Sequence, residues 1–356
     1  MVDNKMREAL YRLIKAAIGE DSDELPKNTN LEELMNLSIQ QNVSSLALAG
    51  LEKASQIVNF SNQDIAKLQW IGQTVLADNT YKQILAVQNE ISDLLKKKGL
   101  KALVLKGAAL AKYYPQPPLR QFCDIDIYPP EDFEAVDGWL KSLGDDYELD
   151  CYRHSQIRIN EVMVENHIYL TDARWKKKWS DLEVFLKKEA ERVLSKTEGF
   201  GLFVADGLFG EVFFMYHALA HFVYDQLNIR FLTDWYYVLK NRDVMYDEDM
   251  VAAFRKFGLI KFAGVLTRLC MERIGLKAGI VPVEVLEEAE TFSSEMILRF
   301  EGDMYSMEHG GFTTNSFRDR VTRLSTFYQN RWKITYFIGT SYLPFVWSKV
   351  IAILRW

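Results

Sequence analysis

Two segments set the architecture of this chain: Leu103-Val-Leu-Lys106-Gly107-Ala-Ala-Leu110 and, after a proline-rich loop, Asp124-Ile-Asp126-Ile-Tyr128. In the first, an apolar run ends at Lys-Gly before an alanine-rich segment, which predicts a strand, a tight turn and a helix. In the second, carboxylates alternate with isoleucines, as they do in a half-buried strand. Together the two segments predict the beginning of a small β-sheet.

On the N-terminal side of these segments the pattern is helical. Apolar residues recur at helical spacing over residues 4–18, 44–53 and 61–98. Asn30, with Glu33 three residues on, predicts the N-cap of a further helix that extends to Gln41. Residues 1–98 are therefore expected to form an N-terminal helical region.

On the C-terminal side, strands give way to helices. A helix is predicted at residues 131–143, followed by strands at 147–153, 156–160 and 162–170 and a short strand pair within 192–204. Further helices are predicted at residues 210–224, 229–241, 247–257, 260–274 and 332–356. The expected fold class is α+β: a small mixed-sheet core over residues 99–204, between the N-terminal helices and a helical C-terminal domain over residues 205–356.

The composition is that of an ordinary globular protein. The 356 residues include 43 Lys+Arg and 49 Asp+Glu, a net charge of −6, and 48% of them are hydrophobic, which excludes wholesale disorder and a collagen-like chain. The mild acidity argues against a strongly basic surface for nucleic acid, although a local groove remains open. Three cysteines that lie far apart provide no CxxC zinc or redox motif.

The two ends of the chain bear on its location. The N-terminus lacks the basic start and apolar block of a signal peptide, so a cytoplasmic location is expected. The apolar tail over residues 332–356 is interrupted by Gly339, Pro344 and Lys349. We therefore expect no transmembrane span and a tail that packs on the helical domain, with a helix on a membrane surface as the alternative.

Asp124 and Asp126 are the strongest candidates for chemistry. Residues i and i+2 of a strand point to the same side, roughly 6.5–7 Å apart along the chain, so both carboxylates can converge on a metal ion. Mg²⁺ prefers oxygen ligands and commonly takes one or two carboxylates together with substrate phosphates. A lone Asp-x-Asp is more often a solvated face.

Basic and glycine residues near this pair suggest a phosphate site. Gly107 permits close approach of the backbone at a strand-to-helix turn, where unpaired N–H groups can meet a phosphate. Lys106 would add a point charge, and Arg120 could bind a phosphate through two nitrogens. Each cation could instead be an ordinary surface residue, with Arg120 ordering the proline-rich loop.

His217 and His221 lie one helical turn apart, on one face of a predicted helix. They could line a nucleotide pocket with Arg230 and Asp234, bind zinc with at least one more ligand, or be hydrogen-bonded histidines of the core. The aromatic run 235–237 is predicted to pack in the core.

The combination resembles the uncharacterised nucleotidyltransferase family of the DNA polymerase beta superfamily. The resemblance rests on the two segments quoted first, and it continues at Val164-Glu165-Asn-His167, at Tyr216-His217-Ala-Leu-Ala-His221 and at Arg230-Phe-Leu-Thr-Asp234. It covers roughly residues 100–240.

This resemblance implies an activity and a set of residues. It implies that Asp124 and Asp126 hold Mg²⁺, with two ions when NTP is bound, and that Glu165 is the third acid, which binds the second ion or deprotonates an acceptor hydroxyl. Relatives often have Asp there, and the strand register leaves Glu161 as the competing position. The implied nucleotide-binding residues are Lys106, Gly107, Arg120, His217, His221, Arg230 and Asp234.

The expected function is Mg²⁺-dependent transfer of NMP from an NTP to the hydroxyl of a small molecule, a sugar or a protein, with release of pyrophosphate. His167 could orient Glu165 or be an ordinary strand histidine. Two other classes compete: a catalytically inactive nucleotide-binding or protein-interaction module of the same fold, and a zinc hydrolase built around His217 and His221.

Overall fold

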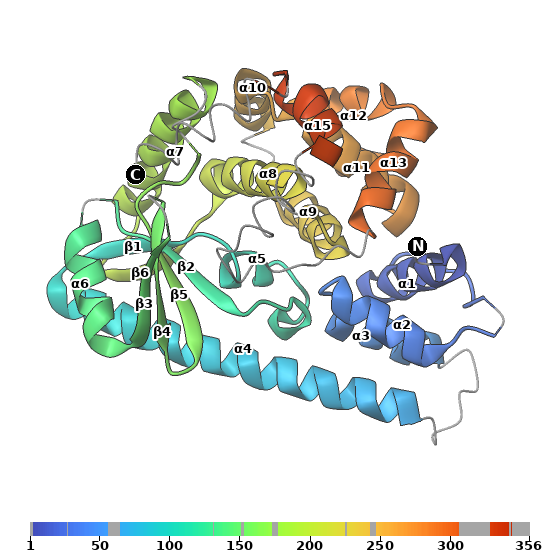
Figure 1. The fold of residues 1–356 in the computed structure, drawn as a ribbon, viewed down its shortest axis with the longest axis horizontal. Helices are drawn as coiled ribbons and strands as arrows, with labels where there is room; N and C mark the ends of the chain where they lie inside the picture. Colours follow the sequence, from blue (N-terminus) through green and yellow to red (C-terminus); the bar gives the residue numbers. More distant parts are fainter. Residues whose placement is uncertain are drawn as a thin grey trace.

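The computed structural model describes residues 3–26, 28–55, 65–130, 132–150, 153–172, 177–224, 226–242, 247–305, 328–341 and 343. It shows a mixed α+β fold in which one six-stranded sheet is surrounded by helices, and a helical part follows the sheet (Figure 1). The predicted fold class is therefore confirmed.

The helices before and within the sheet region are α1 (Asn4–Ile18), α2 (Leu31–Gln40), α3 (Ser44–Ser55), α4 (Ile65–Lys98), α5 (Ala108–Ala111), η1 (Pro117–Leu119), α6 (Phe133–Leu143) and α7 (Lys177–Ser195). Those that follow the sheet are α8 (Gly207–Tyr224), α9 (Ile229–Asn241), α10 (Asp247–Phe257), α11 (Ile260–Ile274), η3 (Ala278–Ile280), α12 (Val283–Glu290), α13 (Ser294–Met304), α15 (Arg331–Lys333) and η4 (Ile334–Ile338). The strands are β1 (Lys101–Val104), β2 (Asp124–Tyr128), β3 (Asp145–Asp150), β4 (His154–Ile159), β5 (Val162–His167) and β6 (Gly201–Val204).

The sheet has the strand order β3-β4-β5-β2-β1-β6. Strand β2 lies in its middle, parallel to β5 and antiparallel to β1, and β1 is parallel to β6. The predicted strand pair within 192–204 is wrong: α7 continues to Ser195, because Leu186, Ala190 and Leu194 keep helical spacing and are buried. Only β6 forms in that region, and it pairs with β1.

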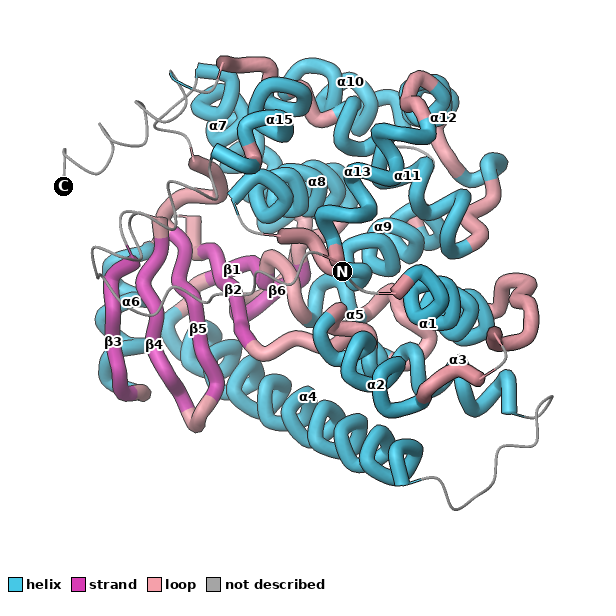
Figure 2. Tube along the Cα trace, turned by 45° about the vertical axis from the view of Figure 1, so that its right-hand side comes forward, coloured by secondary structure: helices cyan, strands magenta, loops and turns pink. Residues whose placement is uncertain are grey.

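Helices α4 and α6 cover one face of the sheet, where Ile125 and Ile127 of β2 pack against residues such as Ile91 of α4 and Leu140 of α6. Figure 2 shows α4 passing beneath the sheet and continuing toward α2 and α3, so this one helix contacts both the sheet and the N-terminal helices. Because side chains alternate along a strand, Asp124 and Asp126 are directed to the opposite face.

The N-terminal helices share a hydrophobic core with the helices that follow the sheet. Leu10 and Leu13 of α1 belong to the same buried cluster as Leu266 of α11, and α1 packs directly on α11. Asn30 caps α2 as predicted, accepting hydrogen bonds from the backbone of Glu32 and Glu33. The N-terminal region therefore packs on the C-terminal helices as well as on α4.

The beginning of the C-terminal tail packs on the helical domain, as predicted. The ring of Phe337 in η4 lies edge-on to those of Phe222, Phe262 and Phe300. The predicted interruption of the tail at Gly339 is confirmed, because Gly339 adopts a left-handed conformation (φ 68°) and ends the helix at Ile338. Residues 344–356 lie outside the described residues. None of the described helices is both long and apolar enough to cross a membrane.

Candidate active site

Three carboxylates meet on the face of the sheet opposite α4 and α6. Asp126 of β2 lies directly beside Glu165 of β5 in the parallel register, and Asp124 lies two residues before Asp126 on the same side. One oxygen from each of the three carboxylates lies within 4.8 Å of the other two, a spacing that a metal ion could bridge. We call Asp124, Asp126 and Glu165 the acidic row. Glu161 is not part of it, because it lies in the turn between β4 and β5 with φ 66°.

Lys106 bridges two members of the acidic row. It lies just after β1, and its Nζ is 3.0 Å from Asp124 Oδ2 and 3.1 Å from Asp126 Oδ1. Burial alone would lower the pKa of this ammonium group, but the charges of Asp126 and Asp124 outweigh burial and raise that pKa above its usual range. Lys106 is therefore charged and neutralises part of the row.

His167 joins the row from the end of β5. Its Nε2 is 3.1 Å from Asp126 Oδ1 and 3.5 Å from Glu165 Oε2. Burial opposes the charged imidazole, but these two carboxylates raise its pKa to about 9. On the other side of the row, the Gln156 amide donates a hydrogen bond of 3.0 Å to Glu165 Oε1. His167 and Gln156 together fix the direction of the Glu165 carboxylate.

The three carboxylates differ in their electrostatics. Burial raises the pKa of Asp126, which is only 1% exposed, to about 6, even though Lys106 opposes this shift. Burial also acts against the ionised forms of Asp124 and Glu165, but Lys106 holds the pKa of Asp124 below its usual value, and His167 and Lys106 hold that of Glu165 far below it. Within the described part of the chain, Asp126 Oδ2 is buried and accepts no hydrogen bond. An orphaned carboxylate oxygen beside two further carboxylates fits a divalent cation.

Arg120 and Asp234 form a buried ion pair that supports the turn at Gly107. The Arg120 Nε and Nη2 groups lie 2.7 and 2.9 Å from the two oxygens of Asp234, and its Nη1 donates a hydrogen bond of 3.2 Å to the Gly107 carbonyl. The Tyr114 hydroxyl also donates to Asp234 Oδ1, at 2.8 Å. Gly107 has φ 58°, and a Cβ there would lie 2.9 Å from the Phe122 ring. Arg120 and Asp234 therefore hold the backbone of the turn.

A cavity of about 380 Å³ opens next to the acidic row. Of the residues singled out in the sequence, it is lined by Lys106, Gly107, Arg120, Asp124, His217, His221 and Arg230. The long helix α4 contributes Thr80 and Tyr81 to its wall, and the ring of Tyr81 lies edge-on to that of Phe122. Asp126, Glu165 and Asp234 are not part of this lining. Residues that lie far apart in the sequence thus converge on one cavity.

The histidines of α8 form part of the cavity wall. The rings of His217 and His221 are 4.4 Å apart, and both lie against Phe231. Burial, followed by the neighbouring His221, lowers the pKa of His217 well below its usual value, so that this ring is neutral. No group of three metal-ligating side chains among the described residues includes either histidine, which leaves the zinc hydrolase without a third ligand there. The aromatic residues 235–237 are buried in the core, as predicted.

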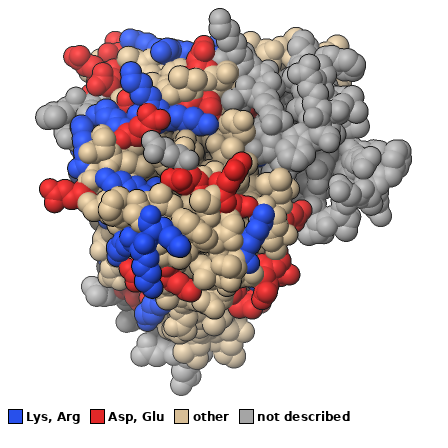
Figure 3. Space-filling model, turned by 90° about the vertical axis from the view of Figure 1, so that its left-hand side faces the viewer, with Lys and Arg blue, Asp and Glu red and all other residues tan. Residues whose placement is uncertain are grey.

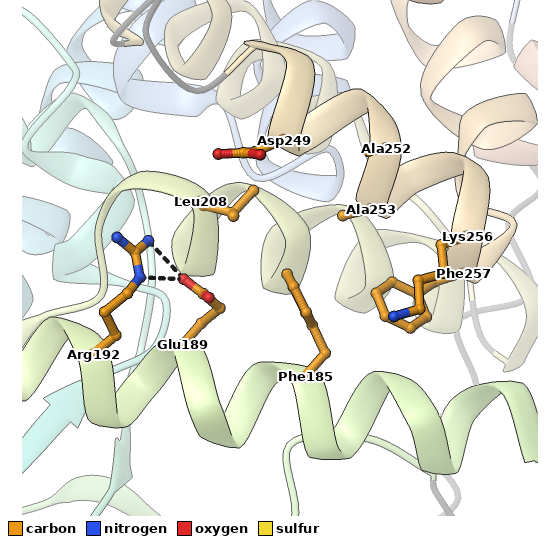
Figure 4. Close-up of a pocket in the computed structure, with 9 residues that line it drawn as sticks. All are labelled: Phe185, Glu189, Arg192, Leu208, Asp249, Ala252, Ala253, Lys256 and Phe257. Atoms are coloured by element: carbon orange, nitrogen blue, oxygen red, sulfur yellow. Dashed lines mark hydrogen bonds and ion pairs between the residues drawn. The ribbon is translucent and has the colours of Figure 1, made fainter.

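A second hollow, of about 400 Å³, lies between α7 and α10 (Figure 4). The side chains of Phe185, Glu189 and Arg192 reach into it from α7, and Arg192 forms an ion pair with Glu189 at 2.6 Å. It contains none of the residues that the sequence singled out. The hollow beside the acidic row is therefore the better candidate for an active site.

The side of the molecule that carries α6 and α7 presents mixed charges. Basic and acidic side chains are interspersed on this face instead of forming separate areas (Figure 3). Such a surface generates no extended field of one sign of the kind that holds a nucleic-acid backbone.

Several residues of the site could not be identified from the sequence by their chemistry alone. His154 and Gln156 reach the acidic row from β4, where they alternate with the buried Ile157 and Ile159. This alternation is the sequence feature that could have identified them, because it directs residues 154 and 156 to the same face as Glu165. Tyr114 and the α4 residues of the cavity carry no such pattern.

A family model described as "Uncharacterised nucleotidyltransferase" matches residues 27–275 of the chain. The matched region contains every residue of the acidic row and of the cavity lining described above. No curated protein and no solved structure matches the chain.

Proposed function

We propose, from the premise that this chain belongs to the family of uncharacterised nucleotidyltransferases, that it transfers NMP from an NTP to a hydroxyl acceptor in a Mg²⁺-dependent reaction. One observation carries the proposal: Asp124, Asp126 and Glu165 bring carboxylate oxygens within 4.8 Å of one another on the sheet face beside an open cavity. Pyrophosphate is the other product. The acceptor is a small molecule, a sugar or a protein.

The acidic row would hold the metal. Three carboxylates supply enough oxygens for the two ions that the family resemblance implies, and the orphaned Asp126 Oδ2 supports a cation at this place. Bound Mg²⁺ supplies charge that neutralises the triphosphate and stabilises the attacking and leaving oxygens of an in-line displacement.

Lys106 has a different role before and after substrate binds. Before binding, its contacts of 3.0 and 3.1 Å keep Asp124 and Asp126 together although like charges repel. A cation held by these carboxylates would take over their neutralisation, and the Lys106 ammonium group, which also lines the cavity, would then be available to bind the phosphates. Arg230, which lines the same cavity, has a buried Nε without a described partner and is a second candidate to bind phosphate.

Glu165 fits the role of a metal ligand better than that of a general base. Its carboxylate is held by Gln156 and His167, and His167 and Lys106 keep its pKa far below the usual value against the effect of burial. A carboxylate with so low a pKa is a weak acceptor for the proton of a hydroxyl. We therefore assign Glu165 the role of a metal ligand. Arg120 and Asp234 are assigned to positioning of the Gly107 turn, because Arg120 binds both Asp234 and the Gly107 carbonyl.

A second candidate function is supported by the same lysine. The Lys106 ammonium group is within 3.1 Å of two of the three carboxylates, and so already provides a positive charge where a cation would bind. A protein that relies on this charge could bind nucleotide without transferring it. Turnover, rather than binding, separates the two candidates.

The test begins with a thermal-shift screen of the four NTPs with and without Mg²⁺. The NTP that stabilises the protein most is then supplied with label in its α- or γ-phosphate, together with fractionated small molecules, sugars and protein hydroxyl acceptors. We expect α-label to appear in the acceptor and γ-label in pyrophosphate. Glu165→Gln should abolish transfer, whereas Glu161→Gln, in the turn of the same hairpin, should leave it unchanged. Mg²⁺-dependent binding without any transfer of α-label would favour the inactive module.

A further inference from the structure

A second group of possible metal ligands lies at the end of the sheet, beside the acidic row. It consists of His154, Glu165 and His167, which we call the histidine group, and one ligand atom from each residue lies within 4.8 Å of the others. Glu165 belongs to both groups. The proposed nucleotidyl transfer requires neither His154 nor a nitrogen ligand.

The strand register brings these side chains together. In the antiparallel pair β4–β5, His154 lies directly opposite His167, and Gln156 lies directly opposite Glu165. Opposed residues of neighbouring antiparallel strands point to the same face and have adjacent Cβ atoms. The next pair of the register, Ile157 and Val164, belongs to the core on the other face. The group is thus built into the sheet and does not depend on a loop.

The distances within the histidine group fit a single ion. Glu165 Oε1 is 3.8 Å from His154 Nε2, and Glu165 Oε2 is 3.5 Å from His167 Nε2. The two imidazole rings have their centroids 5.0 Å apart, at an interplanar angle of 33°. Ligands at about 2.0–2.2 Å from a tetrahedral ion lie roughly 3.3–3.6 Å from one another, so small side-chain movements would suffice.

The environment also suits a metal site. His154 and His167 are buried, being 3% and 8% exposed. The Gln156 Nε2 atom donates to Glu165 Oε1 at 3.0 Å and lies 3.2 Å from His154 Nε2. A neutral amide in this position orients a ligating carboxylate, as the outer-shell partners of metal sites do.

We propose that His154, Glu165 and His167 bind one transition-metal ion of the Zn²⁺ class, with a water molecule in the remaining position. Two imidazole nitrogens select such an ion over Mg²⁺, which prefers oxygen ligands. Binding requires His167 to release the proton that it shares with Asp126, and it replaces their contact of 3.1 Å. Because Glu165 is shared with the acidic row, the ion would hold one carboxylate of the neighbouring Mg²⁺ site in place.

The test uses the full chain, stripped of metal with a chelator and titrated with CoCl₂ while the visible absorption of the cobalt ion is recorded. We expect one equivalent of Co²⁺ to bind and to show the d–d absorption bands of a cobalt ion with four or five ligands. One equivalent of Zn²⁺ should displace it. His154→Gln and His167→Gln should each weaken Co²⁺ binding at least about 100-fold, and Gln156→Met about tenfold.

The matched control is the double variant His217→Gln with His221→Gln, which removes the other histidine pair of the chain and should leave Co²⁺ binding unchanged. X-ray absorption of the zinc complex of this double variant should still show two imidazole ligands. This measurement does not depend on whether His154→Gln folds. The inference is overturned if the parent binds no Co²⁺ with such a spectrum, if His154→Gln binds Co²⁺ as tightly as the parent, or if the double variant loses the two imidazoles.

Asp124→Asn separates this inference from the proposed function. Asp124 belongs to the acidic row but not to the histidine group, so the substitution should abolish Mg²⁺-dependent nucleotide binding and leave Co²⁺ binding intact. If the parent binds nucleotide with Mg²⁺ but no Co²⁺, only the histidine group is refuted. If it binds Co²⁺ but no nucleotide, only the nucleotidyltransferase proposal is refuted.

Discussion

Replacing Lys106 with methionine is expected to destabilise the metal-free protein while increasing the effect of Mg²⁺ on its stability. Methionine preserves much of the side-chain volume but removes the charge. In the described part of the chain, His154 and His167 would then be the basic side chains left within ion-pair distance of the acidic row. The acidic row would become an uncompensated cluster of negative charge on a largely buried face.

The magnitude follows from the two contacts of Lys106. At 3.0 and 3.1 Å, with an effective dielectric constant of about 20, each gives a Coulomb energy of about 5 kcal/mol. Desolvation of the buried charges offsets most of this energy, and removal of one partner of a buried ion pair typically costs about 3–5 kcal/mol. We therefore expect the free energy of unfolding to fall by about 3–5 kcal/mol without divalent ions.

Mg²⁺ should reverse much of this loss. A ligand at 100 times its dissociation constant stabilises the folded state by about 2.7 kcal/mol, and in the variant Mg²⁺ no longer competes with an ammonium group for the carboxylates. Urea unfolding of the parent and of Lys106→Met, with EDTA and with Mg²⁺, measures both effects. The control is Lys112→Met, whose ion pair with Asp206 is 2.7 Å long but solvent-exposed, so a change within about 1 kcal/mol is expected.

Two results would refute this reasoning. One is a Lys106→Met protein that is as stable as the parent in EDTA, which would mean that the ammonium group does not neutralise the acidic row. The other is a stabilisation by Mg²⁺ that is no larger in the variant than in the parent, which would mean that the lysine and the ion do not compete for the same carboxylates.

Three further substitutions test the scaffold of the site, each by urea unfolding. Arg120→Lys should lower the free energy of unfolding by about 3–5 kcal/mol, because a lysine cannot keep both hydrogen bonds to Asp234 in a buried position. A loss below about 1 kcal/mol would contradict the buried ion pair between Arg120 and Asp234. Gly107→Ala should cost about 1–3 kcal/mol, since the backbone has φ 58° and the new Cβ would lie 2.9 Å from Phe122; an alanine variant as stable as the parent would mean that the turn has another conformation. Phe337→Ala should cost about 3–5 kcal/mol, because its ring is buried against Phe222, Phe262 and Phe300; an unchanged stability would show that η4 does not pack on the helical domain.

Local patterns were sufficient to predict most of the elements. The helical spacing in α1 and α9 to α11 gave their ends correctly, and the alternation of carboxylates with isoleucines gave β2. The failures occurred where local signals were weak. Around α7 and β6, the local pattern predicts a strand pair, although the partner of β6 is β1, about a hundred residues earlier. Such long-range pairing leaves no signal in the local pattern.

The residues of the candidate site could also be predicted only in part from local patterns. Alternation along β2 placed Asp124 and Asp126 on one face, but only the register of β2 with β5 distinguishes Glu165 from Glu161. The sequence also suggests that neighbouring carboxylates repel each other, so that Asn at residues 124 and 126 would maintain or raise stability. Because Lys106 lies between these carboxylates, the structure predicts a loss instead.

The partners of the cations were the least predictable feature. A charged side chain can reach any acid that the fold brings near it, and Arg120 meets Asp234 across more than a hundred residues of sequence. The same holds for His154, whose proximity to Glu165 depends on the pairing of β4 with β5.

The central claim is that the acidic row holds the metal of a metal–nucleotide complex, and calorimetry with a nonhydrolysable NTP analogue tests it most directly. The parent should bind the analogue in the presence of Mg²⁺ and much more weakly in EDTA. The double variant Asp124→Asn with Asp126→Asn, verified as folded by circular dichroism, should bind it equally weakly under both conditions. A folded double variant that binds the Mg²⁺ complex as tightly as the parent would contradict the account.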